Sequence, residues 1–255
     1  MIDLHCHVLA GIDDGPETVA GSLALARAAV AAGVSTLVAT PHASSRYPNG
    51  AETIGGLVAE LRERLAAEGV PLRLEGGAEV ALTHVAEIEP SELSRLRLGG
   101  GEWLLVEPPF TPVATALEAI LQEVRGRGHR ILLAHPERCP AFHRDPQMLG
   151  SLVRSGILTS ITAGSLVGRF GAVPRRFALQ LVREEMVHNV ASDAHDLAGR
   201  PPGMRAELEQ AGLGPLTEWL TEAVPAAILG GGGIPARPPF GRPAAGRPRR
   251  WRLRR

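Results

Sequence analysis

The chain has 255 residues, of which 44% are apolar, so it can bury a sizeable core in one large domain or two small ones. This composition argues against a fibre, a disordered chain and a disulfide scaffold. All 27 basic residues are arginine, which excludes a Walker A loop, a Schiff-base enzyme and a lysine nucleophile. The formal net charge is zero, but eight arginines lie in the last 20 residues, which leaves residues 1–235 with a charge of about −8.

Apolar runs alternate with amphipathic stretches along the first 225 residues or so. The predicted strands are 1–7, 34–39, 72–80, 103–107, 131–134, 158–162 and 188–191. The predicted helices are 18–32, 51–68, 113–127, 148–155, 175–185, 204–211 and 216–223. This alternation predicts an α/β fold with a parallel sheet, either closed as a barrel or open and doubly wound.

The end of the chain differs in composition from the rest. From residue 230 onward it is rich in Gly, Pro and Arg and has too few apolar residues to form a core. We therefore expect a folded domain over residues 1–229 and a flexible basic tail over 230–255. Such a tail could contact nucleic acid or an anionic lipid surface, or it could be a solvated end without function.

Polar side chains stand at the carboxyl ends of most predicted strands. The first strand closes with His5-Cys6-His7, and a period of two residues places both imidazoles on one face. Later strand ends carry Thr40-Pro41-His42, Gly77-Ala78-Glu79, Glu107-Pro108-Pro109, His135-Pro136-Glu137-Arg138 and Ser192-Asp193-Ala194-His195. In an alternating barrel these ends converge on the face where active sites lie. Imidazoles and carboxylates without a thiolate array favour a hydrolytic site for divalent metals over a closed structural zinc site.

Ordinary structural roles explain other residues of the same types. Asp13 and Asp14 precede Gly15-Pro16 and, taken alone, fit a turn or the start of the helix that follows. Glu107 ends an apolar strand, where a buried carboxylate is costly unless it meets a cation such as a metal. The remaining histidines are expected to be core or surface residues: His84, His129, His143 and His188.

Cysteine chemistry is a poor explanation for this sequence. Cys6 is expected to be a small buried residue and Cys139 a loop residue. The residues six positions later are Ile12 and Asp145, so the C-x5-R loop of cysteine phosphatases is absent. No basic segment followed by an apolar run opens the chain, and no run reaches the length of a membrane span, so we expect a cytoplasmic protein.

A set of motifs follows one order along residues 1 to about 205: H-C-H, I-D-D-G-P, T-P-H, G-A-E, Glu107, A-H-P-E-R and S-D-A-H-D-L-A-G-R-P-P. In this combination the chain resembles the metal-dependent protein-tyrosine phosphatases of the PHP (polymerase and histidinol phosphatase) domain type from bacterial capsule and exopolysaccharide loci. The resemblance implies a distorted, TIM-like (β/α)7 barrel with a cluster of three divalent metals at its mouth. The segment Ser160 to Gly168 departs from the polar strand end that is usual in the family.

The resemblance also implies a ligand set. One metal would be bound by His5, His7, Glu79 and Asp193, the second by Glu79, Glu107 and His135, and the third by Asp14, His42 and His195. Arg138 would be the phosphate-binding and catalytic arginine, and Arg200 is a further candidate for substrate binding. Manganese is the first candidate metal, and iron, cobalt and zinc accept the same ligands.

The charges of this ligand set suit a phosphorylated substrate. Four carboxylates contribute −4, so three divalent cations would leave the site near +2 and attract a phosphoryl group, which Arg138 would bind with two hydrogen bonds. A phenolate leaving group has a conjugate acid with a pKa of about 10 and needs little help from a general acid.

We therefore expect hydrolysis of phosphotyrosine in proteins, and the resemblance suggests the tyrosine-rich tail of a kinase that controls polysaccharide export. Three alternatives remain at this point. The first is a phosphatase of a small molecule such as histidinol phosphate, and the second a nuclease-like PHP enzyme. The third is a non-catalytic binding protein that uses the arginine-rich tail.

Overall fold

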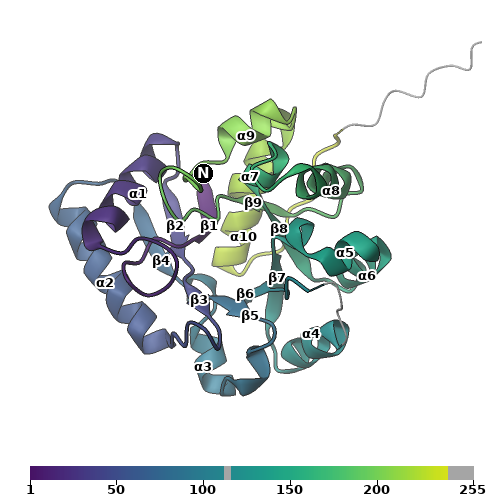
Figure 1. The fold of residues 1–255 in the computed structure, drawn as a ribbon, viewed down its shortest axis with the longest axis horizontal. Coiled ribbons are helices and arrows are strands. Elements are labelled where there is room, and N and C mark those ends of the chain that lie inside the picture. The colour runs from purple at the N-terminus through teal and green to yellow at the C-terminus, as the bar shows by residue number, and fades with distance from the viewer. Residues whose placement is uncertain (112–115, 241–255) are drawn as a thin grey trace, which may run out of the picture.

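Parallel strands form the centre of the fold in a computed structural model that describes residues 1–111 and 116–240 (Figure 1). One sheet has the order β1 (Ile2–Cys6), β2 (Thr36–Ala39), β4 (Arg73–Gly76). The other has the order β3 (His42–Ala43), β5 (Glu79–Ala81), β6 (Trp103–Glu107), β7 (Arg130–Ala134), β8 (Leu158–Thr162), β9 (Asn189–Ala191). Every strand pair described is parallel, and β6, β7 and β8 are almost entirely buried, as expected of strands covered on both faces.

The two sheets combine into a barrel of the (β/α)7 kind. Strand β3 continues the line of β2 after Pro41, and β5 continues the line of β4, so the strands occupy seven positions. Strand β1 lies beside the chain that follows β9, because Cys6 and Ala194 form a parallel bridge and Asp193 donates its backbone N–H to His5 at 2.8 Å. The predicted α/β class and barrel are confirmed.

The single strand predicted over 72–80 is wrong, because the chain leaves the strand at Gly77 and Ala78. A Cβ atom on Gly77 would lie 3.0 Å from the side chain and 3.2 Å from the backbone of Leu98. Ala78 donates its N–H to Leu96 rather than to a neighbouring strand. The close approach of this later segment therefore splits the run into β4 and β5, and β5 begins at Glu79.

Helices surround the strands (Figure 1). They are α1 (Val19–Ala31), α2 (Ala51–Ala67), α3 (Pro90–Arg95), α4 (Leu117–Gly126), α5 (Pro140–Arg144), α6 (Pro146–Arg154), α7 (Ala163–Leu166), α8 (Ala172–Arg183), α9 (Arg205–Gln210) and α10 (Val224–Gly230). Thr18 caps α1 by accepting the N–H of Gly21. The helix predicted over 113–127 is described from Leu117 onward, and residues 113–115 lie outside the described part.

Helix α10 and the residues after it lie against the folded body. Helix α10 packs on β1, and a π-helical turn (Trp219–Ala223) leads into it. The indole N–H of Trp219 donates to Pro235, and Arg237 donates to the backbone carbonyl of Val182 at the end of α8. The predicted boundary at residue 229 stays a prediction, but residues 234 to 240 include contacts with the body, and residues 241–255 lie outside the described part.

Among the described residues, no helix combines the length and the apolar character that crossing a bilayer requires.

Candidate metal centre

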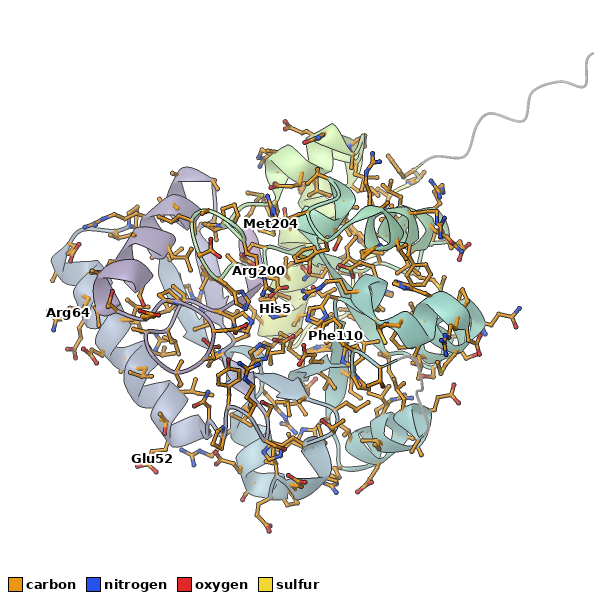
Figure 2. The ribbon with its side chains drawn as sticks, viewed as in Figure 1. His5, Glu52, Arg64, Phe110, Arg200 and Met204 are labelled. Atoms are coloured by element: carbon orange, nitrogen blue, oxygen red, sulfur yellow. The ribbon has the colours of Figure 1, made fainter. Side chains whose placement is uncertain are left out.

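The nine side chains predicted as metal ligands lie together at the carboxyl ends of the strands. They form four overlapping groups with ligand atoms within 4.8 Å of one another: His7, Asp14, His42 and His195; His5, His7 and Asp193; His5, Glu79 and His135; and His42, Glu79 and Glu107. In Figure 2, His5 and Arg200 lie near the middle of the molecule, whereas Glu52 and Arg64 lie at its edge. The parallel strands account for this convergence, because all their carboxyl ends meet at one mouth.

The deepest part of the centre is built on the end of β1. The Nε2 atoms of His5 and His7 lie 3.2 Å apart, and each lies 3.3 Å from Oε2 of Glu79. Asp193, which follows β9, places Oδ1 3.4 Å from Nε2 of His5. All four side chains are at least 98% buried.

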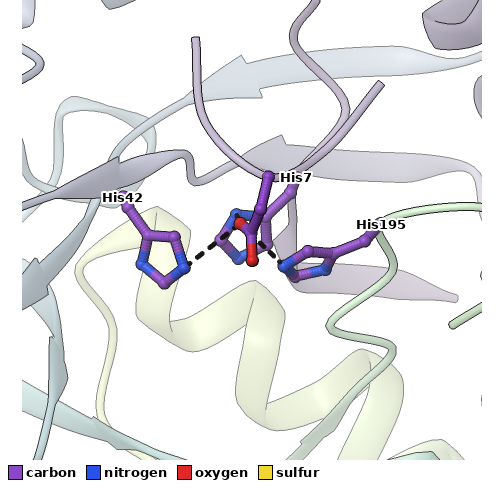
Figure 3. Close-up of side chains that lie close together, drawn as sticks. His7, His42 and His195 are labelled. Atoms are coloured by element: carbon purple, nitrogen blue, oxygen red, sulfur yellow. Dashed lines mark ion pairs between the residues drawn. The ribbon is translucent and has the colours of Figure 1, made fainter. Parts of the chain in front are cut away.

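A second group opens toward solvent. Asp14 places Oδ1 3.4 Å from Nε2 of His42 and 3.3 Å from Nε2 of His195, the ion pairs dashed in Figure 3. The ring of His7 lies between these two histidines in the same view, with its centroid 3.8 Å from that of His195. The Asp14 side chain is 46% exposed, so the cluster is accessible from outside.

The third part lies at the ends of β6 and β7. His135 places Nε2 2.8 Å from Oε1 of Glu79 and 3.7 Å from Oε1 of Glu107. Glu79 thus contacts histidines of both neighbouring groups through its two oxygens. Its central position suits the bridging role expected of it.

The donor chemistry fits divalent cations. Several buried atoms that face the cluster have no hydrogen-bond partner, among them Glu79 Oε2, Asp193 Oδ1 and His195 Nε2. Two imidazole nitrogens only 3.2 Å apart cannot both present lone pairs to each other without a proton or a cation between them. Imidazole nitrogens and carboxylate oxygens are the ligands that manganese, iron, cobalt and zinc accept.

The electrostatics of the metal-free centre reflect its crowded carboxylates. Burial, and then repulsion from Glu79, raises the pKa of Glu107 to about 8. Burial and the nearby charge of Arg138 lower the pKa of His135 to about 4, so this imidazole is neutral at pH 7. Burial works against ionisation of Glu79, but the surrounding histidines outweigh it and hold its pKa well below the ordinary value. A neutral imidazole beside an ionised carboxylate is the state that metal binding requires.

Two of these residues have strained backbones. His135 has a φ of 28° and Asp193 a φ of 52°, both in the left-handed region that non-glycine residues seldom adopt. His135 directly follows β7 and Asp193 follows the end of β9 by two residues, and a turn of the chain at each position directs the side chain into the mouth of the barrel. Such strain is typical of functional sites.

Asp13 is a component that the sequence did not single out. Its carboxylate accepts hydrogen bonds from Nδ1 of His7 at 2.7 Å and from the backbone N–H of His42 at 3.0 Å. With Nδ1 protonated, Nε2 of His7 presents its lone pair to the cluster. Gly15 allows this arrangement, because a Cβ atom there would lie 2.3 Å from the carbonyl oxygen of His7.

Two arginines reach the same centre from different elements. Arg138, in the turn after β7, donates to Oδ2 of Asp193 at 2.7 Å, and Arg200 donates to the same oxygen at 2.5 Å. Glu137, which precedes Arg138, is fully buried and accepts hydrogen bonds from Thr162 N–H and the Ser165 hydroxyl. The segment that departs from the family pattern thus anchors the turn that carries Arg138.

The family model for capsular polysaccharide synthesis, CpsB/CapC, matches residues 1–211 of the chain. The chain belongs to this family. It is 36% identical over 201 residues to the tyrosine-protein phosphatase YwqE of Bacillus subtilis, and the alignment covers 78% of this chain and 79% of YwqE. It is 27% identical over 213 residues to the tyrosine-protein phosphatase CpsB of Streptococcus pneumoniae, and this alignment covers 80% of this chain and 87% of CpsB.

Solved structures agree with this assignment. A chain from the crystal structures of YwqE from Bacillus subtilis and CpsB from Streptococcus pneumoniae, described as unique metal-dependent tyrosine phosphatases, superposes with a TM-score of 0.83 and 33% identity. That match covers 95% of this chain and 100% of the other. A dihydropyrimidinase from Brevibacillus agri superposes with a TM-score of 0.55 and is 12% identical in sequence. The match covers 90% of this chain and 70% of the dihydropyrimidinase chain, and at this identity it shows a shared fold alone.

The other histidines and the cysteines of this CpsB/CapC chain lie outside the metal centre. His143 contacts the carbonyl oxygen of Glu137, and His188 contacts Thr159. His84 pairs with Glu87, and His129 accepts a hydrogen bond from Arg97. Cys6 and Cys139 are buried and unpaired. The four histidines thus have partners away from the cluster, and the two cysteines are part of the buried core.

Proposed function

We propose that this CpsB/CapC chain hydrolyses phosphotyrosine in proteins and binds three divalent cations for this reaction, with manganese as the first candidate. The observation that carries the proposal is the convergence of nine imidazole and carboxylate ligands with two arginines at one mouth of the barrel. The likeness to tyrosine phosphatases of known structure supports it.

The chemistry of each side chain indicates its role in the proposed reaction. When bound, divalent cations lower the pKa of water and draw negative charge from phosphoryl oxygens. Arg138 and Arg200 are the groups that would bind the phosphoryl oxygens, because guanidinium groups donate in parallel to such oxygens. Asp13 would hold His7 in the tautomer that binds metal. The tyrosine leaving group has a conjugate acid with a pKa of about 10, so no dedicated general acid is required.

The proposed physiological substrate is the tyrosine-rich tail of a kinase that controls capsule or exopolysaccharide synthesis. The family's connection to capsular polysaccharide synthesis and the tyrosine phosphatases among its relatives support this choice. We also propose the cytoplasm as the compartment, since both cysteines are unpaired.

A comparison of two substrates tests the activity. The purified, metal-loaded protein is incubated with a phosphotyrosyl peptide and, separately, with histidinol phosphate, and released phosphate is measured. We expect turnover of the peptide at a kcat/KM at least tenfold above that of histidinol phosphate. Turnover of histidinol phosphate alone would contradict the proposal and favour a small-molecule phosphatase.

A further inference from the structure

An exposed phenylalanine stands at the mouth of the barrel. Phe110 follows the end of β6 by three residues, and 48% of its surface is accessible. The sequence has five phenylalanines, all within the described residues, and the other four are buried or half-buried. Core packing therefore accounts for only part of the surface of this side chain.

The ring of Phe110 borders the metal centre. Its centroid lies 5.4 Å from that of His135, with an angle of 24° between the planes. The Cζ atom of Arg138 lies 5.2 Å from the same centroid. Phe110 and His5 both lie near the middle of the molecule in Figure 2. One side of the ring therefore faces the cluster, and the rest of it is open to solvent.

A second ring lies on another side of Arg138. The Cζ atom of Arg138 lies 4.3 Å from the centroid of Phe170, and that of Arg200 lies 5.8 Å from it. Both arginines proposed to bind the phosphoryl group thus lie against aromatic rings, and Arg138 contacts two of them. Cation–π contacts of this kind help to hold a guanidinium group in place.

We propose that Phe110 and Phe170 form an aryl rim that receives the phenyl ring of phosphotyrosine while the two arginines bind its phosphoryl group. The inference rests on the proposed function and names the side chains that select its substrate class. An aryl phosphate carries a flat apolar ring next to its phosphoryl group, whereas a seryl phosphate carries a methylene. Only the former gains ring contacts at this rim, which are worth several-fold in affinity.

The aryl rim predicts a difference between two ligands that cannot be hydrolysed. Benzylphosphonate and ethylphosphonate share the CH2–PO3 group and differ in a phenyl or a methyl group beside it. Their affinities for the metal-loaded protein are measured by titration calorimetry for the wild type, Phe110→Ala and Phe110→Tyr. Val19→Ala is the control, because it shortens another exposed apolar side chain, which lies beside Leu57 and Leu61. The metal content of each variant is measured in parallel.

We expect the wild type to bind benzylphosphonate about tenfold more tightly than ethylphosphonate. Phe110→Ala should reduce this ratio to about two or less, while Phe110→Tyr and Val19→Ala should keep it. An equal weakening of both phosphonates would contradict the rim, because it would show that Phe110 acts only by holding Arg138.

The proposed function can fail independently of the rim. Absence of turnover of a phosphotyrosyl peptide by the wild type would contradict the proposed function. Turnover together with an unchanged affinity ratio in Phe110→Ala would contradict the aryl rim alone.

Discussion

One carboxylate outside the ligand set controls an imidazole within it. Burial alone would lower the pKa of His7, but hydrogen bonds with Asp13 and Glu79 outweigh it and raise this pKa to about 9 in the metal-free protein. The Asp13 carboxylate is buried and receives three hydrogen bonds, so it cannot turn away from His7. This pairing of carboxylate and histidine is the arrangement that raises the basicity of a metal ligand.

Replacing Asp13 tests this support. Asp13→Asn keeps the shape of the side chain but removes its charge, so we expect metal affinity to fall about 10- to 100-fold with the fold intact. The measurement is metal affinity by titration, with circular dichroism as a check on folding. Asp145→Asn, which changes an aspartate at the cap of α6, is the matched control. Unchanged metal affinity in Asp13→Asn would show that the hydrogen bond to His7 has no part in metal binding.

At the scale of elements, a residue after α10 contacts the end of α8, and a histidine just before β9 contacts β8. Arg237 donates to Val182 of α8, and His188, just before β9, contacts the N–H and hydroxyl of Thr159 in β8 through Nδ1. Burial, and then the charge of Arg237, lowers the pKa of His188 to about 4. Neutral His188 accepts the hydrogen bond from Thr159, and a protonated ring would lose this acceptor.

This contact predicts a loss of stability in acid. Between pH 6.5 and 4 the unfolded chain binds a proton at His188 that the folded chain does not, so the free energy of unfolding decreases as pH falls through this window. For His188 the decrease amounts to about 2 kcal/mol at pH 5. The free energy of unfolding is measured with urea at pH 7.5 and at pH 5. Its decrease between the two pH values should be smaller in His188→Gln than in the wild type, by about 2 kcal/mol. The same drop in His188→Gln, the wild type and a His84→Gln control would contradict this role.

Elements that follow from local patterning were predictable from the sequence, and those that depend on distant contacts were not. Apolar runs predicted a strand at each of the seven positions, since buried parallel strands are continuously apolar, but they predicted neither the short strand β3 nor the division of 72–80 into β4 and β5. The break at Gly77 depends on Leu98, which no local pattern shows. The helix predicted over 216–223 continues as α10 to Gly230, because packing on β1 extends it past Pro225.

The candidate site was predicted by the polar residues at strand ends and by the family resemblance. The role of Asp13 could not be predicted, because two adjacent aspartates before Gly-Pro fit a turn equally well. Only the folded chain distinguishes them: Asp13 pairs with His7, and Asp14 pairs with His42 and His195. Phe110 carried no signal in the sequence, since its position over His135 arises from the loop after β6.

At the scale of the whole molecule, the basic end of the chain can be separated from the proposed chemistry. The contacts of Pro235 and Arg237 lie on Trp219 and α8, and the metal centre lies among the carboxyl ends of the strands. Removing the end should therefore affect stability rather than turnover.

Two truncations test this separation. A chain ending at Gly230 loses the contacts of Pro235 and Arg237, whereas a chain ending at Phe240 keeps them. We expect the shorter chain to be less stable than the longer one by about 1–3 kcal/mol, since two hydrogen bonds, one of them from a charged group, and some apolar packing are lost. Both should keep phosphatase turnover within about twofold of the full chain under conditions where they are folded. Equal stability of the two, or complete loss of turnover in both, would contradict this account.

The central claim is that distant side chains gather metals at one end of the barrel and that an arginine beside them acts on the phosphoryl group. Metal content and phosphotyrosyl peptide turnover, measured together for the wild type, His135→Ala and Arg138→Ala, test it most directly. We predict that His135→Ala loses both metal and turnover. Arg138→Ala should keep its metal and lose turnover by about 100-fold or more. Full metal content with normal turnover in His135→Ala, or normal turnover in Arg138→Ala, would contradict the account.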